Sequence, residues 1–94
     1  MNKFNFKAQN YPESPGVYCM LQADGKTLYI GKALNLKKRL SQYFANKHDG
    51  RYQIDLLINE VNHIETIVTN SERDALILEN QLIKRQRPKY NIRL

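Results

Sequence analysis

Glu79 is the residue whose type and position most clearly indicate chemistry. A helical repeat in the segment SERDALILENQLIK predicts one apolar helix face, formed by Ala75, Leu76, Leu82 and Ile83. Glu79 falls in the middle of this face, where an ionised carboxylate is costly unless a cation or a metal compensates it. Two interpretations stay open: an ion pair at the edge of the core, for example with Arg39, or a ligand for Mg²⁺ or Mn²⁺.

Arg39 and Tyr43 lie one helical turn apart, so they share one face of a predicted helix. A guanidinium beside the core can place N–H donors on a phosphate as negative charge grows there. The alternative is a surface arginine that holds an acidic partner. Tyr43 also fits the buried stripe of this helix by its spacing from Leu36 and Leu40.

Two tyrosines stand beside glycines, in the tripeptides Gly16-Val17-Tyr18 and Tyr29-Ile30-Gly31. Each could be a core aromatic, but a glycine in a strand also lets another backbone or a substrate approach closely. A free tyrosine has a pKa near 10, so a role as a base requires a nearby cation. Lys32, three residues after Tyr29, is the natural cation. The hydroxyl could equally orient a water molecule as a neutral group.

Positive charge is concentrated at the two ends of the sequence. Residues 1–47 carry a net charge of +6, residues 48–83 a net charge of −5, and residues 84–94 a net charge of +5. A merely solubilising surface would mix its signs, whereas segregated positive charge is typical of proteins that bind a phosphate backbone. An ordinary basic domain is the alternative interpretation. We therefore predict that the chain binds nucleic acid through charge, by Lys37, Lys38, Lys84, Arg85, Arg87, Lys89 and Arg93.

These residues must be positioned by a small α+β domain. Apolar runs predict strands over 16–22 and 27–33, joined by an Asp-Gly turn, and a third strand over 63–69. Helical periodicity predicts helices over 34–45, 52–61 and 71–87, with a polar loop over 46–50. Asn35 and Ser71 are candidate N-caps, and Pro88 ends the last helix. The order β-β-α-α-β-α predicts a small antiparallel sheet with flanking helices.

Length and composition limit the remaining possibilities. The 94 residues predict one domain over 1–94. No run of about 20 apolar residues and no secretory signal is present, so we expect a cytoplasmic protein without membrane contact. Cys19 is the single cysteine and is expected to be a small core residue. His48 and His63 lack further ligands at metal spacing, which argues against a zinc site.

The motifs described above resemble those of the GIY-YIG nuclease superfamily, most closely the N-terminal endonuclease domains of UvrC. The resemblance extends from about residue 12 to residue 91 and is carried by the two tripeptides, Arg39, Glu79 and Pro88-Lys89-Tyr90-Asn91. It implies a three-stranded antiparallel sheet flanked by helices. It also implies metal-dependent hydrolysis of DNA, with the incision on the 3′ side of a lesion in nucleotide excision repair.

The resemblance further implies individual roles. Glu79 would be the metal ligand, Arg39 would stabilise the scissile phosphate, and Tyr29, assisted by Tyr18, would activate or position the attacking water. Tyr43 and Asn91 match active-site positions, although Asn91 alone would be interpreted as a turn residue. Two-metal nucleases need several converging carboxylates. Because only Glu79 is predicted to face inward, we expect one Mg²⁺ or Mn²⁺ ion.

Several functions stay open on the sequence alone. Whole UvrC proteins carry further segments for a second incision, for the UvrB partner and for recognition of duplex DNA. The 94 residues therefore fit either a monomeric part of a longer protein, which meets a UvrB-type protein through other domains, or a stand-alone nuclease with another DNA substrate. A non-catalytic nucleic-acid-binding module would explain the charge pattern but not Glu79. A structural or protein-interaction domain explains neither.

Overall fold

Three antiparallel strands form the centre of the structure, a computed structural model that describes residues 4–45 and 52–93. Strand β1 (Gly16–Leu21) lies between β2 (Thr27–Ala33) and β3 (His63–Val68). The three predicted strands are confirmed, with small shifts at their ends, and so is the antiparallel sheet. The polar loop predicted over 46–50 lies outside the described residues.

The hairpin between β1 and β2 follows from the chemistry of its turn. Gly25 has a φ of 90°, a conformation that favours glycine, and the Asp24 carboxylate accepts a hydrogen bond of 2.9 Å from the Lys26 N–H. The pairing shifts register between Met20 and Leu21, so one residue of β2 is unpaired there. This hairpin brings Tyr18 and Tyr29 onto neighbouring strands.

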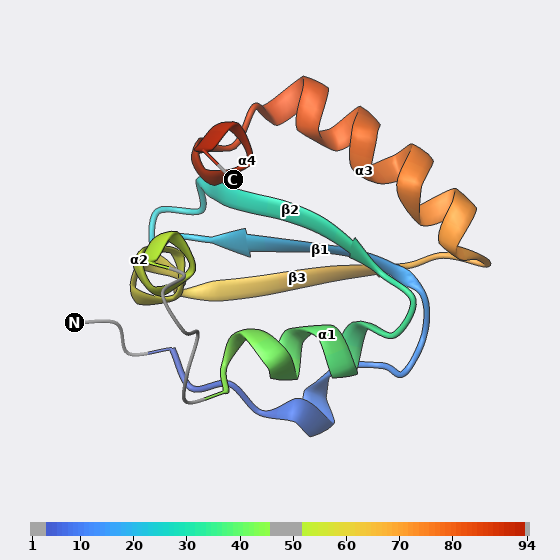
Figure 1. Ribbon diagram of the computed structural model, residues 1–94, viewed down its shortest axis with the longest axis horizontal. Helices are drawn as coiled ribbons and strands as arrows, with labels where there is room; N and C mark the ends of the chain where they lie inside the picture. Colours follow the sequence, from blue (N-terminus) through green and yellow to red (C-terminus); the bar gives the residue numbers. More distant parts are fainter. Residues whose placement is uncertain (1–3, 46–51, 94) are drawn as a thin grey trace.

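Helices cover the sheet on both sides. They are α1 (Leu36–Tyr43), α2 (Tyr52–Glu60), α3 (Glu72–Gln86) and α4 (Lys89–Arg93), with a short 3₁₀ helix, η1, over Ala8–Asn10. Figure 1 shows α3 and α4 along the β2 side of the sheet and α1 on the opposite side. None of the helices in residues 4–45 and 52–93 is long and apolar enough to cross a membrane.

The alternation of side chains in β1 produces a separate core on each face of the sheet. Tyr18 and Met20 pack with apolar residues of α1 and α2, including Leu36, Leu40 and Leu57. On the other face, the buried side chains are Val17, Cys19, Leu21, Ile30 and Ala75, and α3 adds Leu78, Leu82 and Ile83. Cys19 is a buried core residue, as expected, and burial raises the pKa of its thiol to about 11.

The predicted helix starts are confirmed. The Asn35 side chain accepts a hydrogen bond from the Lys38 N–H at 3.0 Å, and Ser71 accepts one from the Asp74 N–H at 3.1 Å. The helix predicted over 34–45 is shorter than expected, since α1 ends at Tyr43. Helix α3 ends with Arg87 in a left-handed conformation, at a φ of 46°, immediately before Pro88.

Helix α4 was not predicted, because five residues are too few to show a helical period. The sequence does contain one signal for it. Proline is favoured at helix starts, and Pro88 both ends α3 and precedes the first residue of α4. Asn91, which without the family motif would be interpreted as a turn residue, therefore lies on a short helix beside β2 (Figure 1).

The glycines of the two tripeptides are required by close packing within the sheet. Gly31 is the cross-strand partner of Tyr18, and a Cβ at position 31 would overlap the Cζ and Oη atoms of the Tyr18 ring. A Cβ at position 16 would overlap the backbone carbonyl oxygen of Ile67 and lie 2.8 Å from the Leu36 Cδ1 atom. Gly16 thus leaves room for β3 and α1 to pack closely, and Gly31 leaves room for the Tyr18 ring.

We predict that Gly31→Ala lowers the free energy of unfolding by about 1–3 kcal/mol, the usual cost of overpacking a filled core. Urea unfolding followed by circular dichroism measures this change. The matched control is the same substitution in a Tyr18→Leu background, where the space above position 31 is partly free. The loss should be smaller there, and equal losses in both backgrounds would show that the Tyr18 contact is not the cause.

Candidate active site along strand β2

Three tyrosines from three elements meet beside β2. Tyr18 comes from β1, Tyr29 from β2 and Tyr43 from α1, and their ring centroids lie 5.7 to 6.4 Å apart. The hydroxyl groups of Tyr18 and Tyr43 share a hydrogen bond of 2.9 Å. Tyr18 and Tyr43 are buried, at 1% and 4% exposure, whereas Tyr29 is partly exposed. Tyr29 is therefore the member of the cluster that can reach a substrate.

Arg39 is held against this cluster by its own helix. Its Nη2 donates a hydrogen bond of 3.3 Å to the Tyr43 hydroxyl, and its Cζ lies 4.7 Å from the centre of the Tyr43 ring. Its Nη1 donates at 3.2 Å to the Gln42 side chain. These contacts fix the guanidinium, so the predicted pairing of Arg39 with Tyr43 on one helix face is observed. Gln42 was not identified from the sequence.

The phenols of Tyr18 and Tyr29 are neutral at physiological pH. Burial raises the pKa of Tyr29 above its usual value, and the neighbouring Tyr43 phenol raises it further. The positive charge of Arg39 acts in the opposite direction, and the negative charge of Glu79 adds to the rise. The pKa of Tyr18 is raised by the same main cause, burial. Arg39 is thus a cation that acts on Tyr29, the role predicted for Lys32.

Lys32 faces a different neighbour. It is three residues from Tyr29 on β2, so the two side chains point to opposite faces of the strand. The Lys32 Nζ lies 3.2 Å from Oε2 of Glu72, the first residue of α3. Lys32 and Arg39 nevertheless line one groove of about 430 Å³, together with Lys38 and Glu72.

Glu79 approaches β2 from α3, but the helix face predicted around it is wrong in one respect. Leu76 is 43% exposed, and Leu78 instead packs toward the sheet with Leu82. The reason is that α3 lies over β1 and β2, so its buried face is turned away from Leu76. Glu79 is consequently partly buried at the border of this face rather than in its middle.

The Glu79 carboxylate has no hydrogen-bond or ion-pair partner within residues 4–45 and 52–93, and the proposed pair with Arg39 is not formed. A partly buried carboxylate without such a partner fits a hard cation, which binds carboxylate oxygens and keeps several waters. In the described part of the chain, no three His, Cys, Asp or Glu side chains converge to hold a metal. The donor set thus fits an ion that takes its remaining ligands from water and substrate.

Asn91 holds the outer edge of β2 next to Tyr29. Its Oδ1 accepts a hydrogen bond from the Ile30 N–H and its Nδ2 donates to the Ile30 carbonyl, both at 2.8 Å. This side chain thereby satisfies both backbone groups of Ile30, in place of a further strand. Sequence reasoning connected Asn91 with the site only through the family motif, and this bidentate contact was not foreseen.

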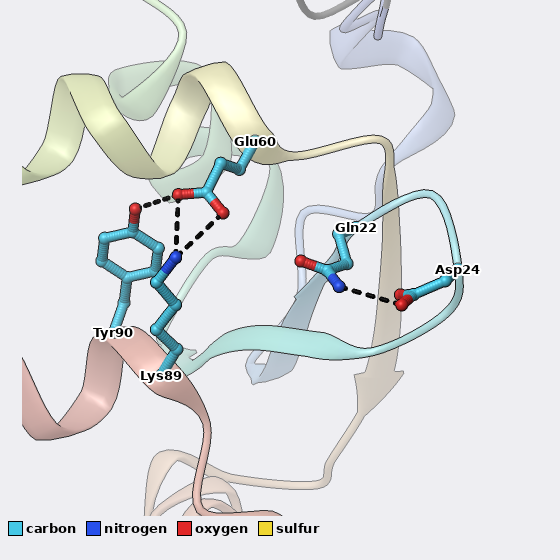
Figure 2. A network of polar contacts seen from close by, with 5 residues as sticks. All are labelled: Gln22, Asp24, Glu60, Lys89 and Tyr90. Atoms are coloured by element: carbon cyan, nitrogen blue, oxygen red, sulfur yellow. Dashed lines mark hydrogen bonds and ion pairs between the residues drawn. The ribbon is translucent and has the colours of Figure 1, made fainter.

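A polar network anchors α4 in this position, and Figure 2 shows it. Lys89 Nζ lies 3.2 Å from Glu60 Oε1, at the end of α2, and the buried Tyr90 hydroxyl also donates to the Glu60 carboxylate. Lys89, predicted to bind DNA, is therefore engaged within the protein. The figure also shows the Gln22 and Asp24 side chains that join across the hairpin turn.

The other predicted DNA-binding residues lie near the two ends of α3 or, in the case of Lys37, on α1. Lys38 lines the groove near the start of α3, and Lys37 is 3.9 Å from Glu13. Lys84 and Arg87 line a hollow of about 340 Å³ near the other end of α3, bordered by Asn91. Arg85 is exposed in the last turn of α3. The side chain of Arg93 lies outside the described part of the structure.

Comparisons with known proteins give one consistent result. A family model described as the UvrC-like GIY-YIG domain matches residues 14–92. The UvrABC system protein C of Syntrophotalea carbinolica is 53% identical over 91 residues, which are 97% of this chain and 15% of that protein. The corresponding protein of Geotalea daltonii is 54% identical over 85 residues, 90% of this chain and 14% of that protein. The chain thus spans a small part of the curated relatives it matches.

A solved structure matches over nearly its whole length. It is the GIY-YIG N-terminal endonuclease domain of UvrC from Thermotoga maritima, bound to its catalytic divalent cation, magnesium. It is 38% identical, with a TM-score of 0.78, and the match covers 93% of this chain and 98% of that one. A point mutant of the same domain, with asparagine replaced by alanine and the cation bound, matches with the same TM-score of 0.78.

We predict that the stability of this chain falls as the pH rises above about 10. The unfolded chain ionises its tyrosines near that pKa, whereas the raised pKa values keep Tyr18 and Tyr29 protonated in the folded state. The folded state then binds more protons, so each phenol removes up to about 1.4 kcal/mol per pH unit above pH 10 and nothing below it. Urea unfolding between about pH 9 and pH 11 measures the slope. Tyr18→Phe should reduce it, and an unchanged slope would contradict the assignment.

For Asn91→Ala we predict a loss of about 1–3 kcal/mol in the free energy of unfolding, since two hydrogen bonds to Ile30 are removed. The specific measurement is amide hydrogen exchange, in which the Ile30 N–H should exchange faster because it has lost its acceptor. Asn62→Ala, at an exposed asparagine, serves as the control. If Ile30 exchanges equally fast in both variants, Asn91 does not hold the strand edge.

Proposed function

Because the chain belongs to the family of UvrC-like GIY-YIG domains, we propose that it is a metal-dependent DNA endonuclease. It would hydrolyse one phosphodiester bond and make the 3′-side incision of nucleotide excision repair. The observation that carries this proposal is the meeting of three groups beside β2: a partly exposed tyrosine, a fixed guanidinium, and a carboxylate that has no hydrogen-bond or ion-pair partner among the described residues. Tyr29, Arg39 and Glu79 supply these groups from three different elements.

The metal in this proposal is a single Mg²⁺ or Mn²⁺ ion held by Glu79. Two findings within the described residues support it: the Glu79 carboxylate has no hydrogen-bond or ion-pair partner there, and no cluster of further ligands is present. When bound, such an ion supplies positive charge against the phosphate oxygens and the leaving oxygen. The binding of magnesium by the Thermotoga maritima domain is consistent with this choice.

Arg39 and Tyr29 have separable tasks in the proposed reaction. A guanidinium has five N–H donors, and the contacts of Arg39 with Gln42 and Tyr43 leave others for the nonbridging oxygens of the phosphate. Fixed donors of this kind stabilise the charge that develops during phosphoryl transfer. Tyr29, a neutral phenol in the free protein, orients the attacking water. It can accept a proton only to the extent that Arg39 and other positive charge lower its pKa.

The other residues of the site support these groups. Tyr18 and Tyr43 share a hydrogen bond, and through their ring contacts they hold Arg39 and Tyr29 in place. Asn91 fixes the strand that carries Tyr29. The basic residues beside the groove and the hollow bind the DNA backbone, with affinity that falls as salt rises.

The wider biological role is proposed on the basis of the relatives. They are UvrABC system C proteins that are much longer than this chain, which corresponds to 15% of one of them. We propose that a UvrB-type protein and the recognition of damage act through other parts of such a protein. This domain would act as a monomer on DNA in the cytoplasm.

We predict that Glu79→Gln abolishes metal-dependent nicking of end-labelled duplex DNA while DNA binding persists, because the substitution removes a ligand charge but no basic residue.

Tyr29→Phe should lower the nicking rate by about 100-fold or more, the usual contribution of a positioned proton-transfer group. The rate is measured with Mg²⁺ or Mn²⁺ and compared with an EDTA blank.

The control is Glu65→Gln, which changes the net charge equally at an exposed position on β3. It should nick at the wild-type rate. Wild-type rates in Glu79→Gln would refute the metal-ligand assignment. DNA binding without any nicking in the wild-type chain, with metal present, would instead favour a binding module.

A further inference from the structure

An ion pair crosses the groove that lies beside the proposed active site. The Lys32 Nζ on β2 is 3.2 Å from the Glu72 Oε2 on α3, and the two side chains are 31% and 48% exposed. Both residues line the groove of about 430 Å³, whose other lining residues include Asn35, Lys38 and Arg39. Among the described residues that line it, Glu72 is the sole carboxylate.

The three positively charged side chains of this groove differ in the hydrogen bonds and ion pairs that they make within the protein. Arg39 is held by Gln42 and Tyr43. Within residues 4–45 and 52–93, the Lys38 ammonium makes no hydrogen bond or ion pair, and Lys32 is paired only with Glu72. A single carboxylate therefore neutralises part of a groove that otherwise presents three positive side chains. This arrangement matches a phosphate, which would meet both lysines at once.

We propose that this groove is a subsite for a backbone phosphate of the cut strand, bound by Lys32 and Lys38. In the free protein, Glu72 holds Lys32 in an ion pair, which the DNA phosphate replaces on binding. The proposal rests on the proposed function, since it takes DNA as the ligand. Exposed ion pairs contribute little to stability, so breaking the pair between Lys32 and Glu72 to bind a phosphate costs little free energy. Phosphate also accepts several charge-assisted hydrogen bonds where the carboxylate accepts one.

The position of the subsite follows from the geometry of α3. Seven residues separate Glu72 from Glu79, which corresponds to about 10 Å along a helix axis. Each DNA strand advances about 3.4 Å per phosphate along the duplex axis. For a duplex whose axis lies along α3, the phosphate held by Lys32 and Lys38 would therefore be about three nucleotides from the scissile phosphate at Glu79. Glu72 therefore affects the affinity for DNA by positioning Lys32, and it does not contact the reacting atoms.

The test is equilibrium binding of a short DNA duplex to the 94-residue chain in EDTA, where no cleavage occurs. Glu72→Gln should tighten binding about three- to tenfold. Two matched controls remove the same charge elsewhere: Glu65→Gln on β3, and Asp74→Asn in the same helix turn. Their effects should be clearly smaller. Thermal unfolding of all three variants checks that each remains folded.

A double-variant comparison assigns the effect to the ion pair. In a Lys32→Met background, Glu72→Gln should tighten binding no more than the two controls do, because the paired cation is gone. Lys32→Met itself should reduce the slope of log affinity against log salt by about one. Equal effects of Glu72→Gln and the controls, weaker binding by Glu72→Gln, or an effect that persists without Lys32 would each overturn the subsite. If the wild-type chain binds no DNA even at low salt, the proposed function fails as well.

Discussion

The Tyr18 ring fills the space above Gly31, and the arrangement of the site depends on this one contact between neighbouring strands. With the ring in that position, its hydroxyl meets Tyr43 and so sets where α1 lies on the sheet. Arg39, one turn earlier on α1, is then aimed at the same cluster. A side chain at position 31 would move all of these groups together, because the surrounding core is close-packed. The two glycine–tyrosine tripeptides are therefore halves of one packing arrangement.

Helices α3 and α4 both contact strand β2, and each contributes to the site. Helix α3 lies along it with Glu72 beside Lys32 at one end, and with Gln86 bonded to Thr27 at the other. Glu79 falls between these two contacts, near Tyr29. Asn91 occupies the free backbone groups of Ile30. Within the described residues, these contacts fix the strand along its length without a fourth strand, while the Tyr29 side chain stays partly exposed to a substrate.

Local chemistry made most of the fold predictable. Ser71 and Asn35 mark helix starts, and the Asp-Gly pair marks the hairpin, because each acts on its own neighbours in sequence. The family resemblance was also correct. The exposure of Leu76 was not predictable, since it depends on which strands α3 covers. The same holds for Gln42 and Glu72, whose relevance appears only when α1 and α3 approach β2. Helix α4 is too short to show a period, and its position depends on the distant Glu60.

The contact between Asn91 and Ile30 joins residues that are 61 apart in sequence. The tyrosine cluster, in contrast, is complete by residue 43. During synthesis the ribosome must therefore deliver residue 91 before the outer edge of β2 is closed, although the hairpin and α1 can associate much earlier. A nascent or C-terminally shortened chain would hold its aromatic cluster without a secured Tyr29. The order of the sequence thus makes Asn91, which secures the strand that carries Tyr29, the last residue of the candidate site to be synthesised.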